Sequence, residues 1–131
     1  MNQNKNKTPK KILFVEDDEQ TIKTVKFVLE RERYEVSIAR DGEAAVRMLD
    51  NPADLILLDL IIPQKNGFDI LKVIRQEKGL KTPVIIFSNL AESINIERAL
   101  KLGANDYIVK NEFPIQIIVN KIKSVLMLSS S

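Results

Sequence analysis

The chain has 131 residues, enough for one compact domain and too few for two ordinary ones. Its composition is typical of a soluble globular protein, no apolar run approaches the roughly 20 residues that cross a bilayer, and a net charge of +2 is too small to favour nucleic acid or a membrane as partner. The chain has no Cys and no His, which excludes disulfides, a thiol nucleophile and an imidazole base, and the lack of Cys is consistent with the cytoplasm.

The two ends of the chain differ in composition from the part between them. Residues 1–10 are polar and rich in Asn and Lys, so we expect a disordered leader there. Residues 129–131 are serines, and we expect a frayed end. Residues 11–128 form the predicted folded domain.

Between these ends, short apolar runs alternate with amphipathic segments. Runs too short for a core helix predict strands over 12–15, 35–39, 55–58, 83–87 and 107–109. Apolar residues at helical spacing predict helices over 20–33, 43–49, 68–77, 93–102 and 114–128. Five strand–helix units of these lengths predict an α/β fold, in which a parallel sheet carries helices on both faces.

Polar side chains follow four of the predicted strands. Glu16 and Asp17 follow the first strand, Asp59 the third, Ser88 the fourth and Lys110 the fifth. Because the carboxyl ends of parallel strands meet at one edge of the sheet, where such sheets bind ligands, we expect these side chains to converge. Three carboxylates, one hydroxyl and one ammonium would then share a site outside the core.

This combination of side chains points to a metal and a phosphoryl group. Clustered carboxylates require a counter-charge, and oxygen ligands without Cys or His favour a hard cation, so we predict Mg²⁺, with Mn²⁺ as a substitute. Lys110 adds a positive charge, and Ser88 adds a hydroxyl that can bond a tetrahedral anion. Asp59, at the end of the central strand, can itself accept a phosphoryl group.

Several spaced motifs together resemble a known family. They are V-E-D-D at 15–18, L-L-D-L-I-I-P-Q-K-N-G at 57–67, V-I-I-F-S at 84–88, G-A-N-D-Y at 103–107 and Y-I-V-K at 107–110. In this order and spacing the chain resembles the receiver domain of two-component response regulators, of the chemotaxis-regulator type, over residues 11–128. The resemblance implies a doubly wound, flavodoxin-like fold whose five parallel strands lie in the order 2-1-3-4-5.

The resemblance also implies a role for each acidic position. Asp59 matches the phosphoacceptor. Glu16 and Asp17 match the acidic pair, with Asp17 directly on the metal and Glu16 reaching it through water, and Ile61 would offer its backbone carbonyl as a further metal ligand. Asp18 falls outside the pair, and we expect it to cap the helix that follows.

Three further positions match the switch residues of the family. Ser88 matches the hydroxyl that turns towards the phosphoryl group, and Lys110 matches the lysine that pairs with it. Tyr107 matches the aromatic side chain whose rotamer follows the hydroxyl.

The implied function is a phosphorylatable signalling switch rather than an enzyme. A sensor histidine kinase or a phosphotransfer protein would supply the phosphoryl group to Asp59 from a phosphohistidine. The surface of helix 93–102, strand 107–109 and helix 114–128 would then change shape, control a partner protein or an output domain, and offer a candidate homodimer interface. Both a stand-alone regulator and a domain of a longer protein are compatible with the sequence.

Three alternatives remain open at this point. A degenerate receiver would dock partners without phosphorylation; the complete set of acids, hydroxyl and lysine counts against that interpretation, although the unusual Asn89 and Asn111 leave it open. A phosphatase with an aspartate nucleophile would share Asp59 and the metal, but it should carry an acid at position 61, where Ile61 stands. A nucleotide-binding module needs a Gly-rich or hydroxyl-rich first loop, and E-D-D-E at 16–19 would repel phosphate.

Four residues depart from the family pattern. Asn111 stands where Pro usually follows Lys110, often in cis, and because a cis bond without Pro costs about 2.5–4 kcal/mol we predict a trans bond. Asn89 replaces a small residue and could narrow access for the phosphodonor. Ile61 and Leu90 flank the expected path of the attacking water and cannot orient it, so we predict slow hydrolysis of the phosphoryl group.

Overall fold

The computed structural model describes residues 8–51, 53–112 and 114–130, and its strands form a five-stranded parallel sheet in the order β2-β1-β3-β4-β5. The strands are β1 (Lys11–Val15), β2 (Glu35–Ala39), β3 (Leu55–Leu58), β4 (Val84–Ser88) and β5 (Asp106–Val109). The predicted strand order is therefore confirmed. The order of the strands reverses between β1 and β3, which makes the carboxyl edge of these two strands the expected ligand site.

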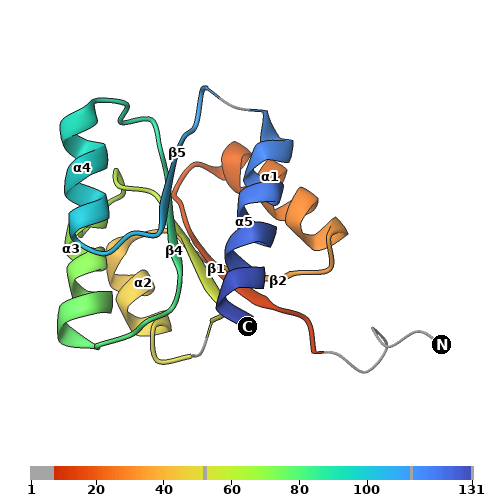
Figure 1. Ribbon diagram of the computed structural model, residues 1–131, viewed down its shortest axis with the longest axis horizontal. Coiled ribbons are helices and arrows are strands. Elements are labelled where there is room, and N and C mark those ends of the chain that lie inside the picture. Colours follow the sequence, from red (N-terminus) through yellow and green to blue (C-terminus); the bar gives the residue numbers. More distant parts are fainter. Residues whose placement is uncertain (1–7, 52, 113, 131) are drawn as a thin grey trace.

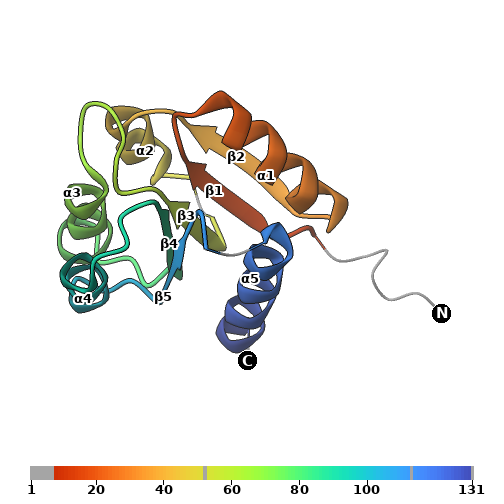
Figure 2. The same cartoon turned by 90° about the horizontal axis from the view of Figure 1, so that it is seen from above.

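Helices cover both faces of the sheet (Figures 1 and 2). One face carries α1 (Glu19–Arg31) and α5 (Ile115–Ser130), and the other carries α2 (Gly42–Met48), α3 (Gly67–Lys72) and α4 (Ser93–Lys101). Among the described residues, no helix combines the length and apolar character needed to cross a bilayer.

Alternate strand residues build a separate core on each face of the sheet. In β1, Ile12 and Phe14 pack in the same core as residues of α1 and α5, whereas Leu13 and Val15 pack in the core on the opposite face. Successive side chains of a strand point to opposite faces, and here both faces are covered. The strand is therefore apolar along its whole buried length, and the acids that follow it lie at the edge of the core.

Two local contacts fix the loops beside this edge. The Asp18 carboxylate accepts a hydrogen bond from Thr21 N at 2.9 Å, so Asp18 caps α1, as predicted. Gly67 begins α3 directly against the loop after β3, and a Cβ atom at Gly67 would lie 2.5 Å from the backbone oxygen of Asp59. Only glycine allows this close approach, which holds the backbone of Asp59 in place.

The predicted helix over 68–77 is wrong in its second half. The α-helix ends at Lys72, and a π-helical turn, η2 (Val73–Glu77), follows it. Lys78 N donates to the carbonyl oxygen of Val73, five residues earlier, at 2.8 Å. Over so short a segment, apolar spacing alone does not distinguish an α-helical turn from a π-helical one.

Arg75, in this π-helical turn, connects three segments of the chain. Its guanidinium donates to the backbone oxygens of Leu80 and Thr82 at 2.8 Å each and to that of Gly103 at 3.0 Å. It also donates to Asn105 Oδ1 at 3.0 Å. Arg75 therefore ties η2 to the loop before β4 and to the turn between α4 and β5.

The helix α4 is attached mainly through its carboxyl half. Ala99 is its one buried residue, and the guanidinium of Arg98 lies 4.0 Å from the centroid of the Phe68 ring in α3. Beyond the helix, Gly103 has a φ of 112°, and a Cβ there would meet the side chain of Arg75 at 2.8 Å. At the amino end, Glu92 provides no side-chain hydrogen bond to cap the helix.

The predicted strands over 35–39 and 55–58 match the structure, and the remaining predicted boundaries differ from it by at most two residues. The last helix continues to Ser130, so residues 129 and 130 are helical rather than frayed. Residues 1–7 of the predicted leader lie outside the described residues, as does Ser131. Residues 8–10 have neither helix nor strand.

Candidate functional site

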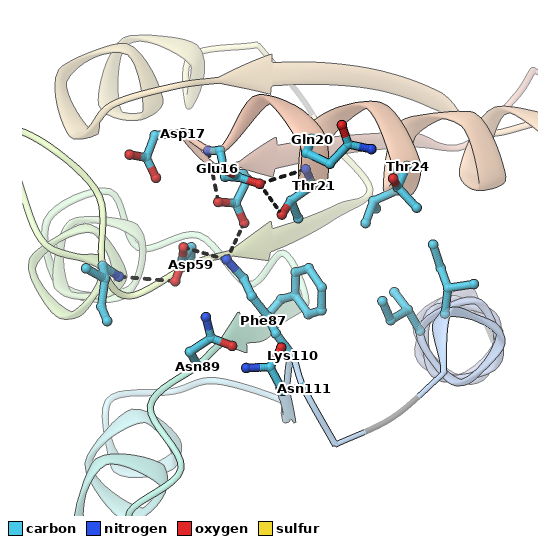
Figure 3. Close-up of a pocket in the computed structure, with 15 residues that line it drawn as sticks. Glu16, Asp17, Gln20, Thr21, Thr24, Asp59, Phe87, Asn89, Lys110 and Asn111 are labelled. Atoms are coloured by element: carbon cyan, nitrogen blue, oxygen red, sulfur yellow. Dashed lines mark hydrogen bonds and ion pairs between the residues drawn. The ribbon is translucent and has the colours of Figure 1, made fainter.

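An acidic group lies at the carboxyl edge of the sheet, where the strand order reverses (Figure 3). Glu16 and Asp17 follow β1, and Asp59 follows the neighbouring β3. One carboxylate oxygen from each of the three residues lies within 4.8 Å of the other two. Glu16 and Asp59 are buried, with exposures of 1% and 3%, whereas Asp17 is exposed. The structure thus brings together the three acids that the strand ends predicted.

Lys110 reaches this group from the end of β5. Its Nζ lies 2.6 Å from Glu16 Oε1 and donates a hydrogen bond of 2.9 Å to Asp59 Oδ2. Burial by itself lowers the pKa of the Lys110 ammonium, but the two carboxylates outweigh this effect and hold its pKa above the ordinary value. Lys110 therefore stays charged between two buried carboxylates.

Glu16 is the most deeply buried of the acids. Burial raises the pKa of its carboxyl group, the neighbouring Lys110 ammonium opposes the rise, and the charge of Asp59 adds to it. Oε2 accepts a hydrogen bond from Asp18 N at 3.2 Å. Oε1 meets Lys110 at ion-pair distance but without hydrogen-bond angles, and it has no hydrogen-bond donor in the described part of the chain.

The acidic group fits a divalent cation. It offers carboxylate oxygens as ligands, and Glu16 Oε1 is a buried oxygen without a hydrogen-bond donor among the described residues. Hard cations such as Mg²⁺ bind oxygen ligands and need only one or two protein carboxylates, since water completes their coordination. Ile61 N donates to Asp59 Oδ1 at 3.1 Å, and a role for the Ile61 carbonyl as a metal ligand stays a prediction.

The two predicted switch residues, Ser88 and Tyr107, contact the same backbone segment. Ser88 is fully buried at the end of β4, and its Oγ accepts a hydrogen bond from Leu90 N at 3.3 Å. The Tyr107 hydroxyl donates to the carbonyl oxygen of Leu90 at 2.7 Å. Burial raises the pKa of the Tyr107 hydroxyl, and the negative charge of Asp59 raises it further by a smaller amount. Leu90 therefore links the hydroxyl of β4 to the aromatic side chain of β5.

A pocket of about 600 Å³ opens from the acids into the space between α1 and α5. Besides the acids and Lys110, its walls include Thr24 and Val25 of α1 and Ile118 of α5. Asn89 and Asn111, which depart from the family pattern, also line it. Ser88 and Tyr107 are not among the described residues that line it, so their predicted roles depend on movement of the loop after β4.

Phe87 belongs to this site, and the sequence reasoning missed it. Its ring lines the pocket, and Lys110 Nζ lies 5.4 Å from the ring centroid. In the sequence it reads as the last core residue of an apolar strand. Its position directly before Ser88 could have indicated this place. Both residues lie at the carboxyl end of β4, where the site is, and successive strand side chains point to opposite faces of the sheet.

The peptide bond between Lys110 and Asn111 is trans, as predicted from the absence of Pro. Asn111 is exposed at the mouth of the pocket. A trans bond therefore accommodates the position of Lys110 beside Asp59.

The strand order and the placement of the acids define the class of protein: a flavodoxin-like α/β domain with an acid-and-lysine site where the strand order reverses. More narrowly, the chain belongs to the response regulator receiver domain family, whose model matches residues 12–123. It is thus a receiver domain of two-component response regulators, in agreement with the resemblance of its motifs.

Individual relatives support the same assignment. The chain is 40% identical to the transcriptional regulatory protein CpxR of Escherichia coli strain K12 over 116 residues, which cover 88% of this chain and 49% of CpxR. Its structure is similar to that of a CheY-like receiver domain protein from Methanospirillum hungatei JF-1. The two are 27% identical with a TM-score of 0.86, and the match covers 94% of this chain and 98% of the other. It is also similar to the BeF3-activated N-terminal receiver domain of Klebsiella pneumoniae RstA. These two are 27% identical with a TM-score of 0.82, and the match covers 88% of this chain and 97% of the other. The chain spans about half the length of the curated relatives it matches.

Proposed function

We propose that the chain is a phosphorylatable switch that accepts a phosphoryl group on Asp59 from the phosphohistidine of a sensor histidine kinase or a phosphotransfer protein. The observation that carries the proposal is the setting of Asp59. Its buried carboxylate lies 2.9 Å from Lys110 Nζ and belongs to an acidic group with Glu16 and Asp17. The similar receiver domain of RstA is described as BeF3-activated, and beryllofluoride mimics a phosphoryl group, which supports the same chemistry here.

In the proposed reaction, a carboxylate oxygen of Asp59 attacks the phosphorus atom of the phosphohistidine. A P–O bond forms while the P–N bond breaks, and the released imidazole nitrogen takes up a proton. Lys110, already beside Asp59, pairs with the phosphoryl oxygens through a charge-assisted hydrogen bond. Glu16, Asp17 and Asp59 would hold a divalent ion, which we propose to be Mg²⁺ with Mn²⁺ as a substitute, and which would supply positive charge beside those oxygens.

The signal would leave the site through Leu90. A phosphoryl group on Asp59 adds charge and acceptor oxygens, which attract the Ser88 hydroxyl away from Leu90 N. The Leu90 carbonyl is also bonded to Tyr107, so a shift of Leu90 changes the surface of α4, β5 and α5. In thermodynamic terms, phosphorylation favours a conformer that forms these new bonds.

The partners follow from this surface and from the relatives. CpxR is named a transcriptional regulatory protein, and this chain spans 49% of it. We propose that the changed surface controls an output domain or a separate protein, with a homodimer through α4, β5 and α5 as one form of that control. The chain acts as a switch rather than an enzyme, because the reaction modifies its own Asp59, and we propose that it does so in the cytoplasm.

The test is incubation with Mg²⁺ and acetyl phosphate, followed by intact mass measurement. The parent chain should gain the mass of one phosphoryl group, and Asp59→Asn should abolish the gain. Asp50→Asn, at an exposed position, is the matched control and should behave as the parent. A parent chain that gains no mass, or an Asp59→Asn variant that still does, would contradict the proposal, and the first outcome would favour a docking module that works without phosphorylation.

A further inference from the structure

Lys110 has a third contact besides its two carboxylates. Its Nζ lies 5.4 Å from the centroid of the Phe87 ring, inside the range of about 6 Å over which an ammonium and an aromatic face attract each other. Phe87 is 4% exposed, and the Lys110 side chain is 12% exposed. This attraction is stronger where water is largely excluded, as it is here.

The ring of Phe87 is itself held in a fixed position. It belongs to the core under α1 and α5, and its centroid lies 6.2 Å from that of the Phe14 ring at a tilt of 47°. Lys110, in contrast, has a long side chain with several rotatable bonds. A rigid ring at the end of β4 can therefore limit the positions that a flexible side chain from β5 adopts.

We propose that Phe87 is a positioning residue that keeps the Lys110 ammonium beside Asp59. This inference rests on the proposed function. Glu16 and Asp59, the carboxylates that pair with Lys110, are also the groups that would hold the cation and the phosphoryl group, so their bonds to Lys110 change during the reaction. The attraction between the Phe87 ring and the Lys110 ammonium does not involve the carboxylate oxygens of Glu16 and Asp59. This attraction therefore remains when the carboxylates are engaged elsewhere.

A purely structural role for Phe87 makes a different prediction from a positioning role. Loss of a buried ring leaves a cavity and lowers stability whichever role the ring has. A positioning role also changes the surroundings of the Lys110 side chain and its use in phosphoryl binding. Phe14 separates the two effects, because it belongs to the same ring pair and the same core, whereas the ring that Lys110 Nζ lies over is that of Phe87.

The experiment compares Phe87→Leu with Phe14→Leu in the full chain. The first readout is the chemical shift of the Lys110 ε-methylene protons, which should lose the ring-current contribution in Phe87→Leu and keep most of it in Phe14→Leu. The second readout is the affinity for beryllofluoride in saturating Mg²⁺, which should fall about threefold to tenfold in Phe87→Leu. The affinity for Mg²⁺ alone should change by less than about twofold, because Phe87→Leu keeps both the Lys110 charge and the three carboxylates of the acidic group.

Two further variants complete the test. Phe87→Tyr keeps an aromatic ring and should restore both readouts, and Phe87→Met, which is unbranched and has no ring, replaces Phe87→Leu if the latter does not fold. An unchanged Lys110 resonance in the ring-free variant, or equal losses of beryllofluoride affinity in the Phe87 and Phe14 variants, would overturn the inference. A parent chain that binds no beryllofluoride would instead contradict the proposed function, while the Lys110 resonance still reports on the ring contact.

Discussion

Lys110 Nζ and Asp59 Oδ2 form a hydrogen bond of 2.9 Å across β4, the strand that separates β5 from β3. The same ammonium lies 2.6 Å from Glu16 Oε1. In the absence of other ligands, Lys110 thus neutralises the carboxylates that would bind a cation. The same positive charge would also lie beside a phosphoryl group bound to Asp59.

Replacement of Lys110 should therefore change two affinities in opposite directions. In Lys110→Met, the affinity for Mg²⁺ alone should rise by up to about tenfold, because no ammonium competes for Glu16 and Asp59. The affinity for beryllofluoride in saturating Mg²⁺ should fall by about tenfold or more, because a charge-assisted bond is lost. Titration calorimetry measures both, with exposed Lys101→Met as the control. Parallel loss of the two affinities would contradict a competing role for Lys110.

Glu16 should give the chain a measurable pH dependence of stability. Because folding raises the pKa of this carboxyl group above its ordinary 4.5, its contribution to stability is present below that value and is lost as pH rises through the folded-state pKa. At neutral pH, Glu16→Gln should therefore raise the free energy of unfolding by about 1 kcal/mol and weaken Mg²⁺ binding. The gain should vanish below the ordinary pKa. Urea unfolding at several pH values measures it, with exposed Glu97→Gln as the control; a gain independent of pH would exclude this explanation.

Tyr107→Phe should loosen the loop after β4. The variant removes the hydroxyl that donates to the Leu90 carbonyl at 2.7 Å, so the free energy of unfolding should fall by about 1 kcal/mol. Amide hydrogen exchange should accelerate over residues 89–92, next to α4. Tyr34→Phe, at another half-buried tyrosine, is the control and should leave exchange in this loop unchanged. Unaltered exchange in Tyr107→Phe would mean that the hydroxyl does not restrain Leu90.

Arg75→Met should be one of the more destabilising substitutions outside the apolar core. It leaves the carbonyl oxygens of Leu80, Thr82 and Gly103 without their guanidinium donor, and the free energy of unfolding should fall by about 2–4 kcal/mol. Thermal unfolding measures the loss. Lys81→Met, at an exposed position in the same loop, should be nearly neutral. Comparable effects of the two variants would show that the contacts of Arg75 contribute little.

The phosphoryl group on Asp59 should hydrolyse slowly in the isolated chain. Ile61 lines the pocket with 56% of its surface exposed, and its side chain cannot hydrogen-bond the attacking water. Ile61→Asn supplies a group that can orient water and should shorten the lifetime severalfold. Loss of the phosphoryl mass with time measures it, with Ile94→Asn, an exposed apolar position in α4, as the control. A lifetime of seconds in the parent chain would show that apolar side chains here do not slow hydrolysis.

The sequence predicted most of what depends on short-range pattern and on the geometry of parallel strands. Apolar runs predict the strands, and the rule that the carboxyl ends of parallel strands meet at one edge predicts that Glu16, Asp17, Asp59 and Lys110 lie together. The strand order came from the motif resemblance rather than from periodicity, because hydrophobic pattern alone does not state which strands are neighbours.

Three features could not be predicted because they depend on contacts between distant segments. The π-helical turn coincides with the contacts of Arg75 to residues as far as Asn105. The ion pair between Lys110 and Glu16 depends on side-chain reach across the sheet, and the contact between the Phe87 ring and the Lys110 ammonium depends on where that ammonium lies. Ser88 and Tyr107 are not among the described residues that line the pocket, and their predicted movement stays a prediction.

The sparse attachment of α4 has an evolutionary consequence. Apart from Ala99 and Arg98, its side chains contribute little to the core, so most substitutions on this helix should change stability by no more than about 0.5 kcal/mol. Under the proposed function, duplicated copies of such a gene would diverge at this helix and acquire different targets, while inheriting an intact fold and an unchanged acidic centre. Target choice and foldability would then be separable traits.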